Sequence, residues 1–163
     1  MTKIDDVITQ VIKDEGGSKV TNDPSDKGGR TQFGIAEKSN PQAWKDGKVT
    51  EDEAREIYLR KYVNGPKFNQ ITHPTLQAQL IDYGVTSGPA IATMKLQGIL
   101  GSTPDGVLGP KTLDHLSKVK DLNWVNNQLV GERVKMICKI VVKDPSQLKY
   151  LSGWIHRCCE FLV

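Results

Sequence analysis

The fold of this chain is set by residues 4–35, IDDVITQVIKDEGGSKVTNDPSDKGGRTQFGI, in which a helical pattern gives way to a glycine-rich loop. Apolar residues recur at spacings of three and four, as on the buried face of a helix. They are Ile4, Val7, Ile8, Val11 and Ile12. Glu15 continues this stripe, and Gly16-Gly17 ends the helix directly after it. The segment therefore predicts a helix packed on a core, with a carboxyl group at its end on the buried side.

Two effects disfavour the charged form of the Glu15 carboxyl group in the predicted helix. Partial burial removes water from it, and the negative end of the helix dipole repels its charge. A carboxyl group that stays protonated near neutral pH is what protonation of a glycosidic oxygen requires. Glu15 is therefore a candidate general acid, and a solvated helix end is the alternative reading of an acidic residue before Gly-Gly.

The loop after Glu15 has few bulky apolar residues, and its glycines allow tight turns, which predicts a small hairpin or irregular lip beside Glu15. These glycines are Gly16, Gly17, Gly28, Gly29 and Gly34. From this lip, Asp26 and Thr31 can face the helix end. A second carboxylate and a hydroxyl there would position a water molecule or stabilise positive charge developing on a sugar ring. Asp-Pro-x-Asp is also common turn chemistry, so a purely structural role is the alternative.

Further motifs follow along the chain. They are Glu56-Ile57-Tyr58 with Tyr62, Asp82-Tyr83-Gly84-Val85-Thr86-Ser87-Gly88-Pro89, Leu96-Gln97-Gly98-Ile99-Leu100-Gly101, Asp105-Gly106-Val107-Leu108-Gly109-Pro110-Lys111-Thr112 and Gly153-Trp154-x-x-Arg157. Together with residues 15–35, this order resembles the family-108 glycoside hydrolases, muramidases found mainly as phage and prophage endolysins. The last two motifs resemble the peptidoglycan-binding region that usually follows the catalytic part.

The resemblance implies roles for individual residues. Glu15 matches the catalytic glutamate of the family. The more distant phage-type lysozymes use a set of Glu, Asp and Thr, and by that similarity Asp26 and Thr31 complete the catalytic group. Asp23 is the alternative to Asp26 as the second carboxylate.

Three tyrosines are candidate contacts to the sugar chain, together with Asp23. Tyr58 and Tyr62 lie four residues apart on one predicted helix face, and aromatic rings offer platforms to sugars. Core packing is the equal alternative for this pair. Tyr83 lies in the motif that begins at Asp82. Two departures from the family remove expected contacts, because Tyr62-Val63 replaces Tyr-Trp and Val85-Thr86-Ser87-Gly88 replaces Val-Asn-x-Gly.

The rest of the chain predicts helices, with starts at Thr50, Pro74, Pro89, Pro110, Asp121 and Ser146. No strand alternation occurs outside residues 17–36. The expected fold is mainly α (α+β), a lysozyme-like helical domain with a small β-hairpin lip near the active site. Residues 1–88 are the predicted catalytic region. Residues 89–163 are the predicted peptidoglycan-binding-like region, packed on the first as one compact unit because no Pro/Gly/Ser-rich spacer separates them.

Composition excludes several other classes. The 163 residues carry a net charge of +3, which suits an anionic polymer such as the bacterial wall and does not argue for nucleic acid. Taken alone, this charge is better explained as ordinary surface charge. The three cysteines are an odd number, as in a chain made in a reducing cytoplasm. The three histidines are scattered and no His-Glu-x-x-His or Cys-x-x-Cys occurs, so we expect no zinc amidase, no cysteine peptidase, no metal and no cofactor.

Basic residues outnumber acidic ones in the last two predicted helices. The basic residues are Arg133, Lys135, Lys139, Lys143, Lys149 and Arg157. They hint at contact with anionic wall or outer-membrane polymers, and a solvated helical surface is the alternative. Residues 105–112 either bind glycan, as the resemblance implies, or simply join two helices.

The expected function is that of an endolysin, a monomer that hydrolyses the β-1,4 bond between N-acetylmuramic acid and N-acetylglucosamine in peptidoglycan and lyses the host cell. A lytic transglycosylase or a non-catalytic peptidoglycan-binding module is the alternative. The first residues are too acidic for a signal peptide, and no apolar run approaches the roughly 20 residues that span a membrane. We therefore expect synthesis in the bacterial cytoplasm and release to the wall by a separate membrane-permeabilising protein.

Overall fold

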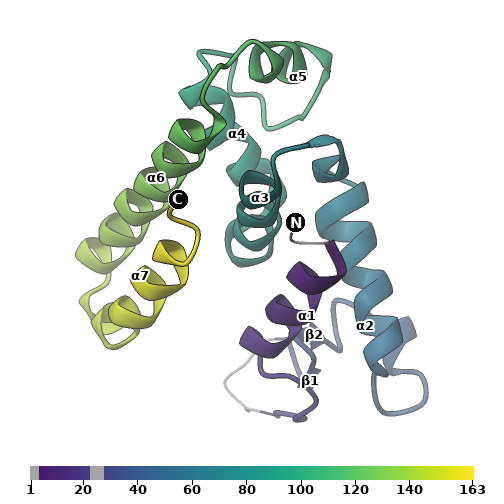
Figure 1. Cartoon of the computed structure of the whole chain (residues 1–163). Coiled ribbons are helices and arrows are strands. Elements are labelled where there is room, and N and C mark those ends of the chain that lie inside the picture. The colour runs from purple at the N-terminus through teal and green to yellow at the C-terminus, as the bar shows by residue number, and fades with distance from the viewer. Residues whose placement is uncertain (1–3, 23–27) are drawn as a thin grey trace. The chain divides into compact units, whose positions relative to one another are not determined.

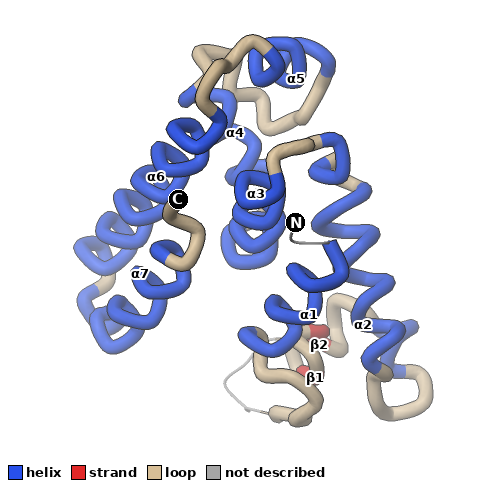
Figure 2. The backbone as a smooth tube through the Cα atoms, viewed as in Figure 1, coloured by secondary structure: helices blue, strands red, loops and turns tan. Residues whose placement is uncertain are grey.

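The computed structural model describes residues 4–22 and 28–163, and the chain divides into two compact units, Met1–Gly65 and Pro66–Val163. Helices are the main elements of both units, and long loops accompany them in the first (Figure 2). A two-stranded antiparallel sheet in the first unit is the one sheet among the described residues. The predicted mainly α fold with a small β lip, of the lysozyme-like kind, is thus confirmed. The functional division between residues 88 and 89 falls inside the second unit and stays a prediction, as does the packing of the two regions together.

The first unit is built on two helices that pack together, α1 (Ile4–Asp14) and α2 (Glu51–Tyr58), with the sheet near them (Figure 1). The predicted apolar stripe of α1 is confirmed, since Val7, Ile8, Val11 and Ile12 are all buried. The predicted capping box of α2 is confirmed too. The Glu53 backbone N–H donates to Thr50 Oγ1 (3.2 Å), and the Thr50 N–H donates to Glu53 Oε2 (2.8 Å).

The second helix does not run uniformly to Tyr62 as predicted. After Tyr58 the chain widens into a π-helical segment, Leu59–Asn64, which closes with a bond from the Gly65 N–H to the Arg60 carbonyl (2.9 Å). A π-helical turn advances side chains differently from an α-turn and is often found at functional sites. The segment begins directly after the first of the two candidate tyrosines and includes the second.

The lip is a hairpin of β1 (Thr31–Gln32) and β2 (Ile35–Ala36), in which Thr31 pairs with Ala36 and Gln32 with Ile35. An isolated bridge joins Thr21 to Thr31 on the outer side. A 3₁₀ turn, Pro41–Trp44, follows the hairpin, and the indole N–H of Trp44 donates to the Ile35 carbonyl (3.0 Å). The hairpin is thus fixed to the core of the first unit through a buried side chain.

The second unit is helical throughout its described elements (Figure 1). They are a 3₁₀ turn (Phe68–Gln70), α3 (Pro74–Ser87), α4 (Pro89–Ile99), α5 (Pro110–Ser117), α6 (Leu122–Lys143), a second 3₁₀ segment (Pro145–Tyr150) and α7 (Leu151–Cys159). Helix α3 is the centre of this unit, because α4 and α6 both pack on it and eight of its residues are buried. Helix α7 packs along α6.

The predicted start of the last helix at Ser146 is wrong. Asp144 is the capping residue, and its Oδ1 accepts hydrogen bonds from the Ser146 N–H (3.1 Å) and hydroxyl (2.6 Å). Pro145 follows it at the first helical position, where a missing N–H costs nothing. The resulting turn is 3₁₀, and the α-helix proper begins only at Leu151.

Candidate active site

Glu15 lies immediately after α1, held by the hydrogen bonds that close the helix. Its N–H donates to the Val11 carbonyl (2.9 Å), and the Gly17 N–H reaches back to the Ile12 carbonyl (2.9 Å). Gly16 and Gly17 both have positive φ, +101° and +58°, which glycine adopts without steric cost. The helix therefore ends as the sequence predicts, and Glu15 is partly buried at that end.

The hairpin turn opposite Glu15 has an uncommon backbone. Its two residues, Phe33 and Gly34, both have positive φ (+52° and +73°), as a type I′ turn requires. Glycine suits such a position, whereas an aromatic residue rarely occupies it. A strained residue persists only where its surroundings hold it.

Two hydrogen bonds hold Phe33 in this conformation. Its N–H donates to the Gly17 carbonyl (2.8 Å), and its own carbonyl accepts from the hydroxyl of Tyr58 (3.0 Å). The first bond ties the turn to the end of α1, and the second ties it to the end of α2. The turn thus joins the two helices of the first unit beside Glu15.

Gly34 lies against Glu15 without room for a side chain. A Cβ atom at this position would come within 2.8 Å of Glu15 Cβ and 3.3 Å of Glu15 Cγ, and closer still to the Tyr58 hydroxyl. Real Cβ atoms essentially never come within 3.0 Å of another atom, so Glu15 or Tyr58 would have to shift. Glycine at residue 34 is therefore needed both for its backbone conformation and for the close approach to the candidate acid.

Tyr62 also lies within electrostatic range of Glu15. Burial raises the pKa of the Tyr62 hydroxyl, and the negative charge of Glu15 raises it further. Its ring lies 5.6 Å from that of Tyr58, at an angle of 35°. Tyr62 is partly exposed, whereas Tyr58 is only 2% exposed. Core packing therefore describes Tyr58, and Tyr62 is the member of the pair that can reach a ligand.

Sequence reasoning missed two residues that hold the lip. Gln32 donates to the Ser18 carbonyl (3.0 Å) and accepts from the Val49 N–H (2.9 Å), so it links both flanks of the lip. Arg30 forms a bidentate ion pair with Glu37, in which its Nε donates to Oε2 (3.0 Å) and its Nη2 donates to Oε1 (2.7 Å). Its guanidinium also lies 4.8 Å from the centre of the Trp44 ring. An Arg and a Glu seven residues apart around a predicted turn could have suggested the ion pair.

Of the other predicted members of the catalytic group, the structure describes Thr31. Thr31 lies in β1, where its N–H and carbonyl both pair with Thr21 (2.9 Å each). Asp23 and Asp26 lie outside the described residues. The structure therefore brings Glu15 together with Tyr58, Tyr62 and Gly34, and the second carboxylate stays a prediction.

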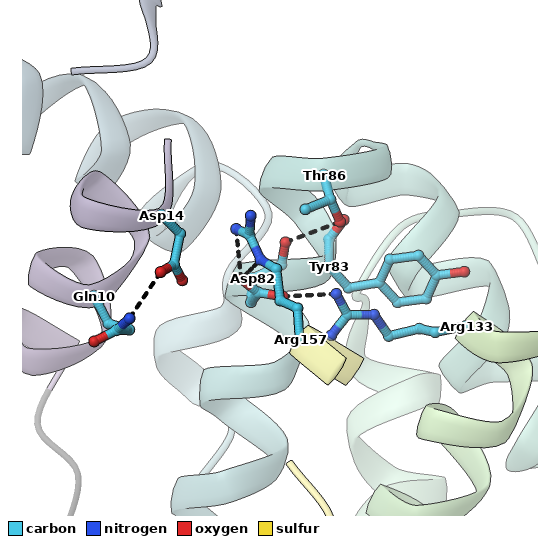
Figure 3. A network of polar contacts seen from close by, with 7 residues as sticks. All are labelled: Gln10, Asp14, Asp82, Tyr83, Thr86, Arg133 and Arg157. Atoms are coloured by element: carbon cyan, nitrogen blue, oxygen red, sulfur yellow. Dashed lines mark hydrogen bonds and ion pairs between the residues drawn. The ribbon is translucent and has the colours of Figure 1, made fainter. Parts of the chain in front are cut away.

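A neighbouring carboxylate, Asp14, is exposed and accepts a hydrogen bond at Oδ1 from Gln10 Nε2 (2.8 Å), one helical turn back (Figure 3). Asp14 and Glu15 are adjacent in sequence but differ in setting. Asp14 belongs to the solvated face of α1 and Glu15 to the side that meets the turn. This pair offers a matched comparison for mutagenesis.

Tyr83, predicted as a sugar contact, has a packing role in the second unit. Its side chain has no exposed surface, and its hydroxyl donates to the sulfur of Met136 (3.4 Å). Burial raises its pKa to about 12. The Arg133 guanidinium lies 4.9 Å from its ring centre (Figure 3). A buried ring offers no face to a ligand. Tyr83 therefore packs in the core, and its predicted contact to the sugar is wrong.

The residue before it, Asp82, joins three helices of the second unit. Its Oδ2 accepts from Arg133 Nη2 of α6 (2.6 Å), and its Oδ1 accepts from Arg157 Nε of α7 (2.9 Å) (Figure 3). The side chains of Asp82 and Arg133 are each only 4% exposed. Two of the six basic residues predicted to face an anionic polymer are thus engaged inside the unit.

The loop at residues 105–112 is organised by one buried side chain, Gln97. Its amide donates to Asp105 Oδ1 (2.7 Å), the Val107 carbonyl (3.1 Å) and Thr112 Oγ1 (3.0 Å), and its carbonyl accepts from the Gly106 N–H (2.9 Å). The bond from Gln97 also lowers the pKa of Asp105. These bonds favour the joining role of the loop between α4 and α5.

The chain is similar to one protein family and to solved structures. Residues 8–88, just under half of the chain, match the protein family described as Glycosyl hydrolase 108. The structure is similar to that of Brucella abortus SagA, with 27% sequence identity and a TM-score of 0.71, over 95% of this chain and 88% of that one. No curated protein sequence matches the chain. The matched segment, which includes Glu15 and its surroundings, carries a glycoside hydrolase domain.

Proposed function

We propose that this glycoside hydrolase is an endolysin-type N-acetylmuramidase, which cleaves the β-1,4 bond between N-acetylmuramic acid and N-acetylglucosamine in bacterial peptidoglycan. The observation that supports this most is the setting of Glu15. It is a partly buried carboxyl group at a helix end, pressed against a strained turn, inside the segment that matches the family. Positioned carboxyl groups of this kind protonate leaving oxygens.

In the proposed mechanism, Glu15 donates a proton to the glycosidic oxygen as the bond breaks. A second carboxylate stabilises the positive charge on the sugar ring or activates water. We assign this role to Asp26, with Asp23 as the alternative, and expect Thr31 to assist in orienting the water. Tyr62 would contact the sugar beside Glu15.

Mass spectrometry of digested peptidoglycan tests the proposal. A muramidase releases fragments that end in a reducing N-acetylmuramic acid, because water adds across the bond. A lytic transglycosylase releases 1,6-anhydro ends, which are lighter by one water. A binding module releases nothing. Reducing ends support the proposal, and either other result overturns it.

We expect Asp26→Asn to slow turnover strongly while leaving binding to insoluble wall unchanged, because the loss falls on the charged transition state and not on the ground state. Asp23→Asn is the matched variant and should affect the melting temperature more than the rate. Initial rates on purified peptidoglycan and thermal melts separate the two. The opposite order of rates would transfer the role to Asp23.

We expect Gly34→Ala to lower turnover by about 10²-fold, because the added Cβ displaces Glu15 and small displacements of a catalytic group are costly. Gly47→Ala is the matched control, since Gly47 has a similar φ of +79° but open space around it. Both variants carry the same backbone strain. Equal rates for the two would contradict the role of Gly34 in placing the acid.

The proposed localisation is synthesis in the host cytoplasm, followed by release through a separate permeabilising protein. None of the helices in residues 4–22 and 28–163 is long and apolar enough to cross a membrane.

We further propose that anionic wall or outer-membrane polymers contact the exposed end of α6 and the turn after it. Lys139, Lys143 and Lys149 are exposed there beside Val142 and Leu148. We expect the protein to act as a monomer.

A further inference from the structure

The second unit has a surface groove where α4 packs on α6. Its volume is about 430 Å³, within the range of roughly 300–1,000 Å³ that small-molecule sites occupy. The residues that line it include Met94, Lys95, Gly98, Trp124, Gln128 and Glu132. None of these residues contributes to the candidate active site.

An exposed tryptophan forms one wall of this groove. Trp124 lies in the first turn of α6, where its backbone N–H donates to Oδ1 of the capping residue Asp121 (3.0 Å). The residue is 49% exposed. Met94 on α4 is 37% exposed. Large apolar side chains left open around a concavity commonly mark a binding site, and a rigid indole face is a good partner for the apolar face of a pyranose ring.

Polar groups line the rest of the groove. Glu132 forms ion pairs with Lys135 (2.8 Å) and Lys95 (3.1 Å), and the hydrogen bonds from these two ammonium groups lower its pKa. The exposed amide of Gln128 lies one helical turn from it on α6. The groove thus presents an acceptor, an ammonium donor and an amide around one aromatic face.

Gly98 leaves the α4 side of the groove open. A Cβ at this position would meet no atom within 4 Å, and no positive φ constrains it. A helical residue with free space above it can accept a larger side chain without strain. Gly98 therefore offers a way to fill the groove while keeping every side chain that lines it.

We propose that the α4–α6 groove is a saccharide-binding subsite that takes one amino-sugar ring of a glycan strand, stacked on Trp124 and hydrogen-bonded by Gln128, Lys95 and Glu132. The inference rests on the proposed function, because it takes the same polymer as ligand. A partner helix is a poorer fit, since such a helix needs a continuous series of apolar anchor pockets. Here an ion pair interrupts the apolar surface.

Fluorine NMR of the full-length Glu15→Gln protein, labelled with 5-fluorotryptophan, tests this subsite directly. The chain has three tryptophans, and Trp124→Phe assigns the resonance of Trp124. Titration with the β-1,4-linked tetramer of N-acetylglucosamine should shift that resonance saturably. Gly98→Leu should abolish the shift, whereas Gly153→Leu, an exposed helical glycine with equal free space on α7, should leave it intact.

A Trp124 resonance that does not move at saturating tetramer overturns the subsite. So does an unchanged shift in Gly98→Leu. The outcome is independent of the proposed cleavage, which is read from the fragments released by the protein with Glu15 intact. A supporting result on wall material is that Trp124→Ala lowers the affinity for insoluble peptidoglycan by about tenfold, as the loss of an aromatic anchor does.

Discussion

The variant Glu15→Gln is expected to fold like the parent chain and to lose about 10²–10⁴-fold in turnover on peptidoglycan, the usual contribution of a general acid. Glutamine keeps the shape of the side chain and its packing against Gly34, but it has no proton to give to a leaving oxygen. The effect should fall on kcat, because the proton is transferred only in the transition state. Initial rates of turbidity loss in wall suspensions measure it.

Asp14→Asn is the matched control for this variant. It removes one negative charge from the next residue along the chain, and an asparagine oxygen can still accept the bond from Gln10. Its turnover should stay close to that of the parent. A folded Glu15→Gln protein that lyses walls at the rate of Asp14→Asn would remove Glu15 from the mechanism.

Asp82→Ala should destabilise the second unit by about 3–5 kcal/mol, the cost of removing one partner from a buried ion pair. The substitution leaves the Arg133 guanidinium, whose side chain is 4% exposed, without the carboxylate that it donates to. Arg157 loses the same partner. Urea denaturation should show the loss as a lower midpoint.

Asp114→Ala tests whether burial causes this effect. Asp114 also pairs with a basic residue, Lys118 (2.6 Å), but the two side chains are 54% and 70% exposed. Exposed pairs contribute little, so the urea midpoint should hardly change. Equal midpoints for Asp82→Ala and Asp114→Ala would show that the network of Asp82 does not hold the three helices together.

The elements of this fold were predictable where the signal is local. The stripe on α1, the capping box at Thr50 and the cap at Asp121 each depend on residues within one or two turns of each other. The proline starts of α3, α4 and α5 were predictable for the same reason. The position of Glu15 at the end of its helix follows from the same kind of short-range sequence signal.

The surroundings of Glu15 were not predictable, because they depend on contacts between distant segments. A Phe-Gly pair in the sequence does not predict a turn with two positive φ angles. Phe33 is held in this conformation by its hydrogen bonds to the distant residues Gly17 and Tyr58. The burial of Tyr83 was not predictable for a related reason. Helix α3 is covered on several sides, so a residue outside its main stripe is still buried.

The network of Asp82 has a consequence for how parts of this chain can be exchanged with those of other proteins. Helix α3 ends the segment that matches the family, yet its Asp82 neutralises arginines from α6 and α7, which lie beyond that segment. A recombinant that joins residues 89–163 to a foreign catalytic region would inherit both cations without their anion. The better point to join two proteins therefore lies near residues 65 and 66, where one compact unit ends and the next begins. A junction there keeps α3 in the same segment as α6 and α7.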